Sequence, residues 1–218
     1  MIDFAAAREA MVARQIEGRG IANPALSAAL RDVPREAFVS QDLAAFAYDD
    51  TPLPIEAGQT ISQPYIVALM IDAAGVKPGA HVLEIGAGSG YAAAVMSRIA
   101  DRVIAVERQE ELARLAAARM ARLGYGNVRI VHGDGSAGWP EAAPYDAVLA
   151  AASGSHVPEA LKAQLAIGGV LVMPVGAPGS VQSLIRIVRT GAEAYEEKNL
   201  CAVRFVPLIG AQGWADTA

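Results

Sequence analysis

Between residues 64 and 176, short and continuously apolar segments alternate with segments that favour helix. Two examples of the apolar segments are "HVLEIG" at 81–86 and "RVIAVE" at 102–107. This alternation is typical of βαβ units, in which the strands lie parallel in one sheet. Helices cover both faces of such a sheet, so its strands are apolar on both sides. The chain is therefore predicted to be an α/β protein with a doubly wound, mostly parallel sheet.

The flanking regions follow other patterns. Residues 3 to 50 are expected to form short helices separated by prolines, with Asp3 as an N-cap, Pro24 in the first turn of the second helix, and a restart after Pro34. Residues 51–58, with two prolines and a glycine, are expected to be loop. After Gly176, the segments 180–189 and 200–210 are predicted to form an antiparallel hairpin at one edge of the sheet. The expected strands of the core are 81–86, 102–107, 127–135, 145–152 and 168–176, and its expected helices are 65–74, 90–100, 109–123 and 158–165.

No repeat or linker marks a second domain. We therefore expect one domain over 1–218, comprising a helical extension (1–56), an α/β core (57–176) and a C-terminal hairpin with a tail (177–218). With 53% hydrophobic and 19% charged residues, the chain can build a sizeable core.

Composition also narrows the class of function. The net charge of −5 argues against a protein that grips a nucleic-acid backbone. No apolar run reaches the ~18 residues that a membrane span requires, and the N-terminus has the pattern of an amphipathic helix instead of a signal peptide. The single cysteine, Cys201, excludes an intrachain disulfide and a zinc cluster. We expect a cytoplasmic monomer with no membrane, nucleic-acid or metal partner.

The strongest local motif is "VLEIGAGSGY" at 82–91, where a strand ends and a helix begins. Glycines let a ligand approach the backbone closely. The dinucleotide fingerprint G-x-G-x-x-G fails, because Tyr91 occupies its last position. The pattern G-x-G-x-G with Glu84 before it instead suits S-adenosylmethionine, whose amino group and sulfonium are cationic. A plain strand-to-helix turn is the simpler alternative.

Two further acidic residues follow the next two strands. Glu107 comes roughly 20 residues after Gly86, the offset at which a carboxylate binds ribose hydroxyls in this topology. Asp134, in "GDG" at 133–135, is placed to accept from an adenine amino group. A helix-start carboxylate and an Asx turn are their simpler alternatives. Because carboxyl ends of parallel strands share one edge, all three carboxylates are expected to meet there.

Four hydrogen-bonding side chains gather between Gly58 and Pro64, in "QTISQ" at 59–63. A turn needs fewer, so we interpret this segment as the holder of a polar ligand. Hydroxyl and amide groups can bind an anion without removing protons. For Ser62 the alternative is an N-cap of the helix that follows, worth about 1 kcal/mol.

These segments resemble the protein-L-isoaspartate O-methyltransferases. The resemblance is carried by "VLEIGAGSGY", "PLPIEAGQTISQPYIVALM", "GDGSAGWPE", "GGVLVMPVG" and "VRFVPLIG", and also by "MVARQIEGRGI" and "VPREAFV" near the N-terminus. It covers nearly the whole chain. It implies a Rossmann-like class I fold with a seven-stranded sheet in which the final pair of strands is interchanged, and the activity of a protein-L-isoaspartate(D-aspartate) O-methyltransferase.

The resemblance also implies roles for individual residues. The cofactor is S-adenosyl-L-methionine, the product S-adenosyl-L-homocysteine, and the substrates isoaspartyl-containing proteins and peptides, whose repair starts through a succinimide. Ser62 is the implied catalytic residue. The implied cofactor-binding residues are Thr60, Ile61, Ser62, Glu84, Gly86, Gly88, Ser89, Glu107, Asp134 and Gly135. The implied substrate-binding residues are Gln59, Arg204, Val206 and Leu208.

Two departures from the family pattern leave the substrate open. Glu56-Ala57 replaces a glycine-containing step, and "LAAAS" at 149–153 lacks an expected threonine. One alternative is a carboxyl methyltransferase of the same fold that acts on a peptide natural product or small molecule. Another is a catalytically silent S-adenosylmethionine-binding module, which could dispense with the polar 59–63 segment. A nucleic-acid methyltransferase is disfavoured by the charge and by "AAAS" where an Asn-Pro-Pro-Tyr-type loop would stand.

Overall fold

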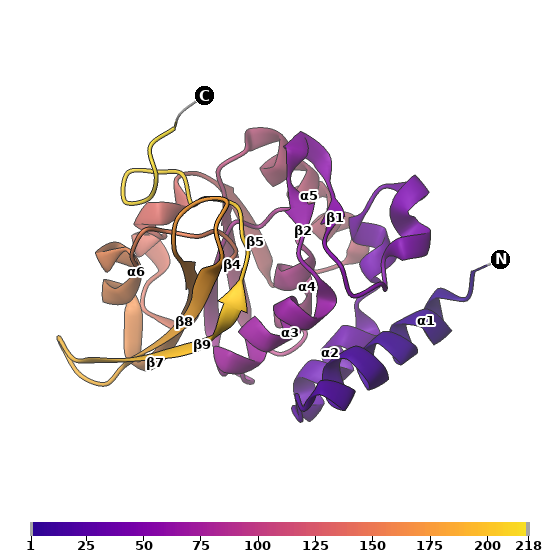
Figure 1. The fold of residues 1–218 in the computed structure, drawn as a ribbon, viewed down its shortest axis with the longest axis horizontal. Helices are drawn as coiled ribbons and strands as arrows, with labels where there is room; N and C mark the ends of the chain where they lie inside the picture. Colours follow the sequence, from indigo (N-terminus) through magenta and orange to yellow (C-terminus); the bar gives the residue numbers. More distant parts are fainter. Residues whose placement is uncertain (1, 217–218) are drawn as a thin grey trace.

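The computed structural model describes residues 2–216, and its centre is a seven-stranded sheet (Figure 1). The strand order is β5-β4-β3-β6-β7-β8-β9. The first five of these strands pair in parallel, and β8 and β9 are antiparallel, as the sequence predicts. The strands are β3 (His81–Ile85), β4 (Arg102–Glu107), β5 (Val128–His132), β6 (Tyr145–Ala150), β7 (Leu165–Val175), β8 (Gln182–Arg189) and β9 (Tyr195–Val203).

The two faces of the sheet form two separate cores. Consecutive residues of β3 alternate between them: Val82 belongs to one core and Leu83 to the other. The first core also contains side chains of the N-terminal helices, and the second contains Leu161 of the short helix before β7. Burial on both faces explains why the parallel strands are continuously apolar. The helices of the core are α3 (Pro64–Ala73), α4 (Tyr91–Ser97), α5 (Glu110–Leu123) and α6 (Glu159–Ala163).

The N-terminal extension has the cap predicted at Asp3 and a second cap at Asn23, which was not predicted. Asp3 accepts from the amide of Ala6 and starts α1 (Phe4–Met11), and Asn23 accepts from the amide of Leu26 and starts α2 (Pro24–Asp32). The segment after Pro34 is a short 3₁₀ helix, Arg35–Phe38. Figure 1 shows α1 and α2 side by side at the opposite end of the molecule from the β8–β9 hairpin.

The expectation of an unstructured loop at 51–58 is wrong. β1 (Leu53–Pro54) pairs antiparallel with β2 (Thr60–Ile61), and a 3₁₀ turn, Glu56–Gly58, joins them. Strands of two residues have too short an alternation to be recognised in a sequence. This small ribbon fixes the first part of the polar 59–63 segment, residues 59–61.

The predicted C-terminal hairpin is confirmed, but its second strand is shifted. β9 (Tyr195–Val203) begins before the predicted segment 200–210, and it contains polar residues that lie between the two predicted segments. Charged side chains are tolerated there because β9 is an edge strand. Residues 204–214, which we call the C-terminal strap, leave the sheet, and Pro207 lacks the N–H that a continued ladder would need. The strap contributes only isolated bridges, to Ser153 and within itself.

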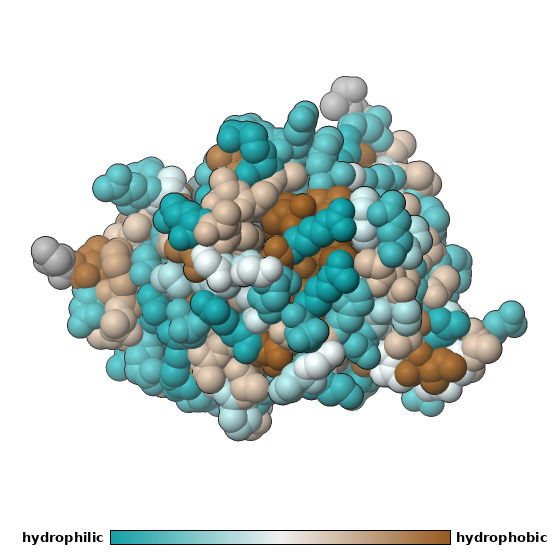
Figure 2. All heavy atoms as spheres, turned by 180° about the vertical axis from the view of Figure 1, so that it is seen from behind, coloured by the Kyte–Doolittle hydropathy of each residue, from teal (hydrophilic) through white to brown (hydrophobic). Residues whose placement is uncertain are grey.

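The face of the molecule in Figure 2 is mostly hydrophilic, with an apolar area near the centre that hydrophilic side chains partly cover and smaller apolar areas toward the edges. Within residues 2–216, no helix is long and apolar enough to cross a membrane.

Candidate active site

A cleft of about 490 Å³ lies at the carboxyl edge of the sheet. The order of the strands reverses between β3 and β6, and ligands of open α/β sheets bind at such a reversal. The cleft is lined by four segments: the 59–62 loop, the glycine loop after β3, the end of β4, and the C-terminal strap. A narrower pocket of about 60 Å³ continues from it past Glu84 and Ser89.

The glycine loop takes a shape that only glycine adopts readily. Gly86, Gly88 and Gly90 all have positive φ, at 86°, 52° and 87°. At Gly90, a Cβ atom would lie 2.8 Å from Cε of Met120, so the end of that side chain would have to shift to make room. At Gly86 and Gly88 the nearest atoms to such a Cβ are side-chain carbons beyond 3.4 Å. Bare backbone therefore faces the cleft at these two glycines.

Glu107 ends β4 and is 7% exposed. One carboxylate oxygen accepts from the amide of Gly88 at 2.8 Å, and the other accepts from the amide of Gln109 at 2.9 Å. Each oxygen keeps a second lone pair, which can accept from ligand hydroxyl groups in the cleft. The simpler alternative, a carboxylate at a helix start, also describes the contact with Gln109. The contact with Gly88 goes beyond it and ties β4 to the glycine loop.

Glu84 is buried beside the narrower pocket, with 3% of its surface exposed. Burial raises the pKa of this carboxyl group well above its usual value, and repulsion from Glu107 adds to the shift. Its Oε2 atom has no hydrogen-bond partner within residues 2–216. A buried carboxylate without a partner is costly, whereas a cationic ligand group beside it removes the penalty. Glu84 therefore fits the amino group of S-adenosylmethionine.

Asp134 has the geometry of the Asx turn that was the simpler alternative. Oδ1 accepts from both the amide and the hydroxyl of Ser136, and Oδ2 accepts from the amide of Ala211 at 2.7 Å. Partial burial alone would raise the pKa of Asp134, but the amide of Ala211 and the donors of Ser136 outweigh it and lower the pKa. Oδ2 keeps one lone pair for a ligand donor. The neighbouring Gly135 lines the cleft.

The side chains of the polar 59–63 segment lie in different places: most line the cleft or its narrower pocket, and one does not. Gln59, Thr60 and Ser62 line the cleft, and Ile61 lines the narrower pocket. Gln63 does not face the cleft, because its amide donates to Asp50 of the N-terminal extension at 2.8 Å. The N-cap of α3 is Gln63, without a side-chain cap bond, so the alternative of Ser62 as a helix cap is wrong.

The Glu56-Ala57 departure lies beside this segment. Ala57 has φ of 53°, a left-handed conformation that glycine adopts without strain. Glu56 pairs at 3.4 Å with Arg119 of α5, and Arg119 donates to the carbonyl of Ser89 in the glycine loop at 2.7 Å. Arg119 thus links the two loops of the cleft. Arg119 is one of three arginines on this amphipathic helix, and nothing in the sequence distinguishes it from the other two.

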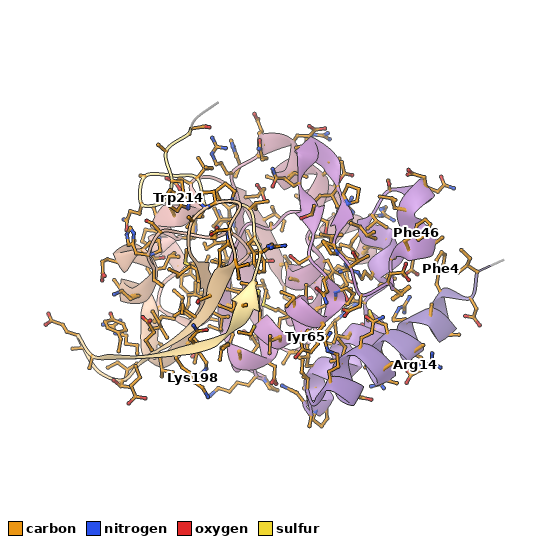
Figure 3. The ribbon with its side chains drawn as sticks, in the orientation of Figure 1. Phe4, Arg14, Phe46, Tyr65, Lys198 and Trp214 are labelled. Carbon is orange, nitrogen blue, oxygen red and sulfur yellow. The ribbon has the colours of Figure 1, made fainter. Side chains whose placement is uncertain are left out.

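The C-terminal strap forms the remaining wall, to which Arg204, Val206 and Leu208 contribute. Ser153 fixes the strap: its amide donates to the carbonyl of Val206, and its carbonyl accepts from the amide of Leu208, both at 2.8 Å. The indole of Trp214, labelled in Figure 3, donates to the same carbonyl of Ser153.

Gln182 of β8 also holds the strap, although no sequence motif points to it. Its side-chain amide accepts from the amide of Phe205 at 2.7 Å and donates to the carbonyl of Phe205 at 3.1 Å. A buried glutamine in an alternating strand has no motif around it, so only the tertiary structure reveals this role.

The lining of the cleft contains no histidine, lysine or cysteine. Within residues 2–216, no group of three His, Cys, Asp or Glu side chains could hold a metal ion. The arrangement brings together the carboxylates of Glu84 and Glu107, the glycine loop, and the hydroxyl and amide groups of the 59–62 loop, and the cleft is also lined by Arg108 and Arg204. It can therefore place a cationic ligand next to an anionic one, and it has no obvious general base.

Several known proteins with similar sequences carry the same name. Residues 6–213 match the family model for protein-L-isoaspartate(D-aspartate) O-methyltransferase. The chain is 59% identical to protein-L-isoaspartate O-methyltransferase 1 of Rhodopseudomonas palustris over 99% of this chain and 88% of that protein. It is 57% identical to protein-L-isoaspartate O-methyltransferase 2 of Pelobacter propionicus over 95% of this chain and 92% of that protein.

Solved structures agree with these sequences. One protein-L-isoaspartate O-methyltransferase superposes with a TM-score of 0.87 at 30% identity, over 94% of this chain and 67% of that one. A structure of this kind from Plasmodium falciparum, in complex with S-adenosyl-L-homocysteine, superposes with a TM-score of 0.80 at 25% identity, over 93% of this chain and 98% of that one.

Proposed function

We infer that this chain, which belongs to the protein-L-isoaspartate O-methyltransferase family, methylates the free α-carboxylate of L-isoaspartyl residues in proteins and peptides, with S-adenosylmethionine as the methyl donor. The observation that carries this inference is the composition of the cleft. Carboxylates suited to a cationic donor and uncharged polar groups suited to an anionic acceptor line the same space, with Gly86 and Gly88 between them.

The residues at the strand ends fit the donor in three ways. Glu84 offers an unpaired, buried carboxylate oxygen to an ammonium group. Glu107 offers its remaining lone pairs to ribose hydroxyls, and the bare backbone of the glycine loop permits close approach. We propose that Asp134 and Gly135 border the adenine, and that Thr60, Ile61 and Ser89 line the remainder. When bound, S-adenosylmethionine supplies an electrophilic methyl group on a sulfonium.

The acceptor needs binding and orientation but no proton transfer. An α-carboxyl group titrates at about 3.3–3.7, so it is ionised at pH 7 and already nucleophilic. We propose that Ser62 and Gln59 hold this carboxylate through neutral donors. A lysine at that place would stabilise the anion before the reaction and lower its nucleophilicity. Correct placement of the carboxylate against the methyl group, together with the exclusion of water, then supplies most of the rate enhancement.

The strap is the proposed binding site for the peptide around the isoaspartyl residue, with Arg204, Val206 and Leu208 in contact with it. Val206 is 40% exposed although it lines the cleft, as expected for an apolar residue that a substrate covers. The succinimide that starts repair forms after release, when the next backbone nitrogen of the peptide attacks the methyl ester, and it needs no residue of this chain. We further propose that the protein acts as a cytoplasmic monomer, without nucleic-acid or membrane partners.

The test uses radiolabelled S-adenosylmethionine and three matched peptides that differ only in an L-isoaspartyl, L-aspartyl or D-aspartyl residue. We expect base-labile label in the isoaspartyl peptide and little in the L-aspartyl one. Equal labelling of both L peptides, or labelling of a small molecule alone, would overturn the assignment of the substrate. Binding of the donor without any transfer would point to the silent module.

A further inference from the structure

Arg35 is a fully buried cation behind the site, at 0% exposure. It belongs to the 3₁₀ helix of the N-terminal extension and does not line the cleft. Its Nε donates to the carbonyl of Ala47 and its Nη2 donates to the carbonyl of Ser62, both at 2.7 Å. Within residues 2–216 it forms no ion pair with a carboxylate, and its Nη1 has no hydrogen-bond partner.

Such an arrangement is unfavourable for stability alone. A buried charge is normally paired with an opposite charge, because desolvation is expensive. Here the guanidinium contacts two carbonyls and the ring of Tyr91, whose centroid lies 4.7 Å from its Cζ. Asp50 attracts it only from beyond ion-pair distance. Tyr91 is the first residue of α4, directly after the glycine loop. One buried cation therefore touches both the acceptor-binding loop and the start of the helix that follows the glycine loop.

The fork of the guanidinium limits where Ser62 can lie. The two donors, Nε and Nη2, lie in one rigid plane, and they bind the carbonyls of Ala47 and Ser62, which are 15 residues apart along the chain. Because these donors are charged, their hydrogen bonds are stronger than those of neutral donors. Asp50 grips the neighbouring Gln63 from the same side. The backbone of Ser62 is thus fixed from behind, while its side chain lines the cleft.

We propose that Arg35 is a positioning residue for methyl transfer, which fixes the backbone of Ser62 and thereby the orientation of the donors that hold the acceptor carboxylate. The proposal rests on the function inferred above. It predicts that loss of the guanidinium fork impairs the use of the isoaspartyl peptide more than it impairs the binding of S-adenosylhomocysteine, for which Glu84 and Glu107 remain in place.

The test compares Arg35→Lys with Arg8→Lys. Arg8 is a matched control in the same extension: it also donates to a backbone carbonyl, that of Arg31, and it also packs on a tyrosine ring, that of Tyr48. Its hydrogen bonds and its ion pair within residues 2–216 go to Arg31, Glu36 and Tyr48, and none goes to the 59–63 segment. For each variant we would measure melting temperature, kcat and KM with an isoaspartyl peptide, and the Kd of S-adenosylhomocysteine by calorimetry.

We expect Arg35→Lys to lower kcat/KM by at least tenfold while the Kd changes less than threefold, and Arg8→Lys to leave both within twofold. Equal kcat/KM in the two variants would overturn the proposal, and so would a loss of S-adenosylhomocysteine affinity as large as the loss of kcat/KM. If Arg35→Lys does not fold, Arg35→Gln at low temperature takes its place. If neither Arg35 variant folds while Arg8→Lys does, then Arg35 serves stability, and the proposal is overturned as well. An inactive wild-type protein would instead refute the inferred function.

Discussion

Glu107 accepts a hydrogen bond from the amide of Gly88 at 2.8 Å, so the carboxylate that ends β4 holds the loop that follows β3. The two strands are neighbours in the sheet, and their carboxyl ends meet at this bond. The same carboxylate also binds the amide of Gln109 at the start of α5. One side chain thus sets the distance between two walls of the cleft, and its replacement has a specific consequence.

We expect Glu107→Gln to weaken S-adenosylhomocysteine binding by about tenfold or more. Both oxygens of Glu107 face backbone donors, and glutamine must place its own NH₂ group against one of them. Hydrogen bonds to a charged group contribute roughly 1.5–3 kcal/mol, and about 1.4 kcal/mol corresponds to a factor of ten. Calorimetry measures the change. Glu110→Gln, an exposed site in the first turn of α5, is the control, and equal affinities of the two variants would contradict the prediction.

Glu84→Gln should stabilise the ligand-free protein while it weakens donor binding. The pKa of Glu84 is raised in the folded state, so its contribution to stability is fully present below the unfolded pKa and is lost as pH rises through the folded pKa. The melting temperature of the wild type should therefore decrease relative to that of Glu84→Gln as pH increases from 5 to 8. Differential scanning calorimetry at several pH values checks this difference.

A second measurement on Glu84→Gln separates its effect on the binding of the donor from its effect on stability. The Kd of S-adenosylhomocysteine should rise by at least about tenfold at pH 7.5, because the neutral amide no longer pairs with an ammonium group. Glu141→Gln, at an exposed surface position, should change neither property. An unchanged Kd would show that Glu84 does not bind the donor, even if the melting temperatures differed as predicted.

Ser62→Ala should lower kcat/KM for an isoaspartyl peptide by about tenfold to a hundredfold, with little change in melting temperature. A lost hydrogen bond to a charged group accounts for that range. Stability should persist because the side chain of Ser62 does not cap α3. Steady-state kinetics and thermal melting, with Ser40→Ala as the control, test this. A drop of several degrees with full activity would show that the hydroxyl serves the fold alone.

Gly90→Ala should destabilise the protein by about 1–3 kcal/mol. The positive φ of 87° costs roughly 1 kcal/mol for a side chain, and the new Cβ meets Cε of Met120 at 2.8 Å. Gly126→Ala is a suitable control, because no atom lies within 4 Å of a Cβ built there. Urea unfolding measures both. Equal free energies of unfolding would show that the loop relaxes freely.

Much of the fold could be predicted because its signals are local. Apolar runs such as 81–86 and 102–107, separated by amphipathic helices, define a parallel sheet without knowledge of any contact. Asp3 and Asn23 likewise cap helices within three residues of themselves. β1 and β2 could not be predicted, because two-residue strands exist only through their partners. The shift of β9 has the same origin, since the polarity of Tyr195–Asn199 is allowed by its place at an edge.

The residues of the candidate site also divide into those with a local sequence signal and those without one. Glu84, Gly86, Gly88 and Glu107 were identified from spacing alone, and the structure brings them to one cleft. The contacts of Arg35, Arg119 and Gln182 were not identified, because each reaches the site loops from a distant part of the chain. For Gln63, the orientation depends on Asp50, a partner 13 residues away that no motif announces.

The C-terminal strap has a consequence for how the protein is made. Ser153, Gln182 and Asp134 hold it, so this wall of the cleft can form only after all the strands have left the ribosome. A nascent chain, or one clipped by a protease after β9, still carries the strand ends proposed to bind the methyl donor. It lacks the surface proposed to bind a damaged peptide, and it would therefore sequester the cofactor without performing repair.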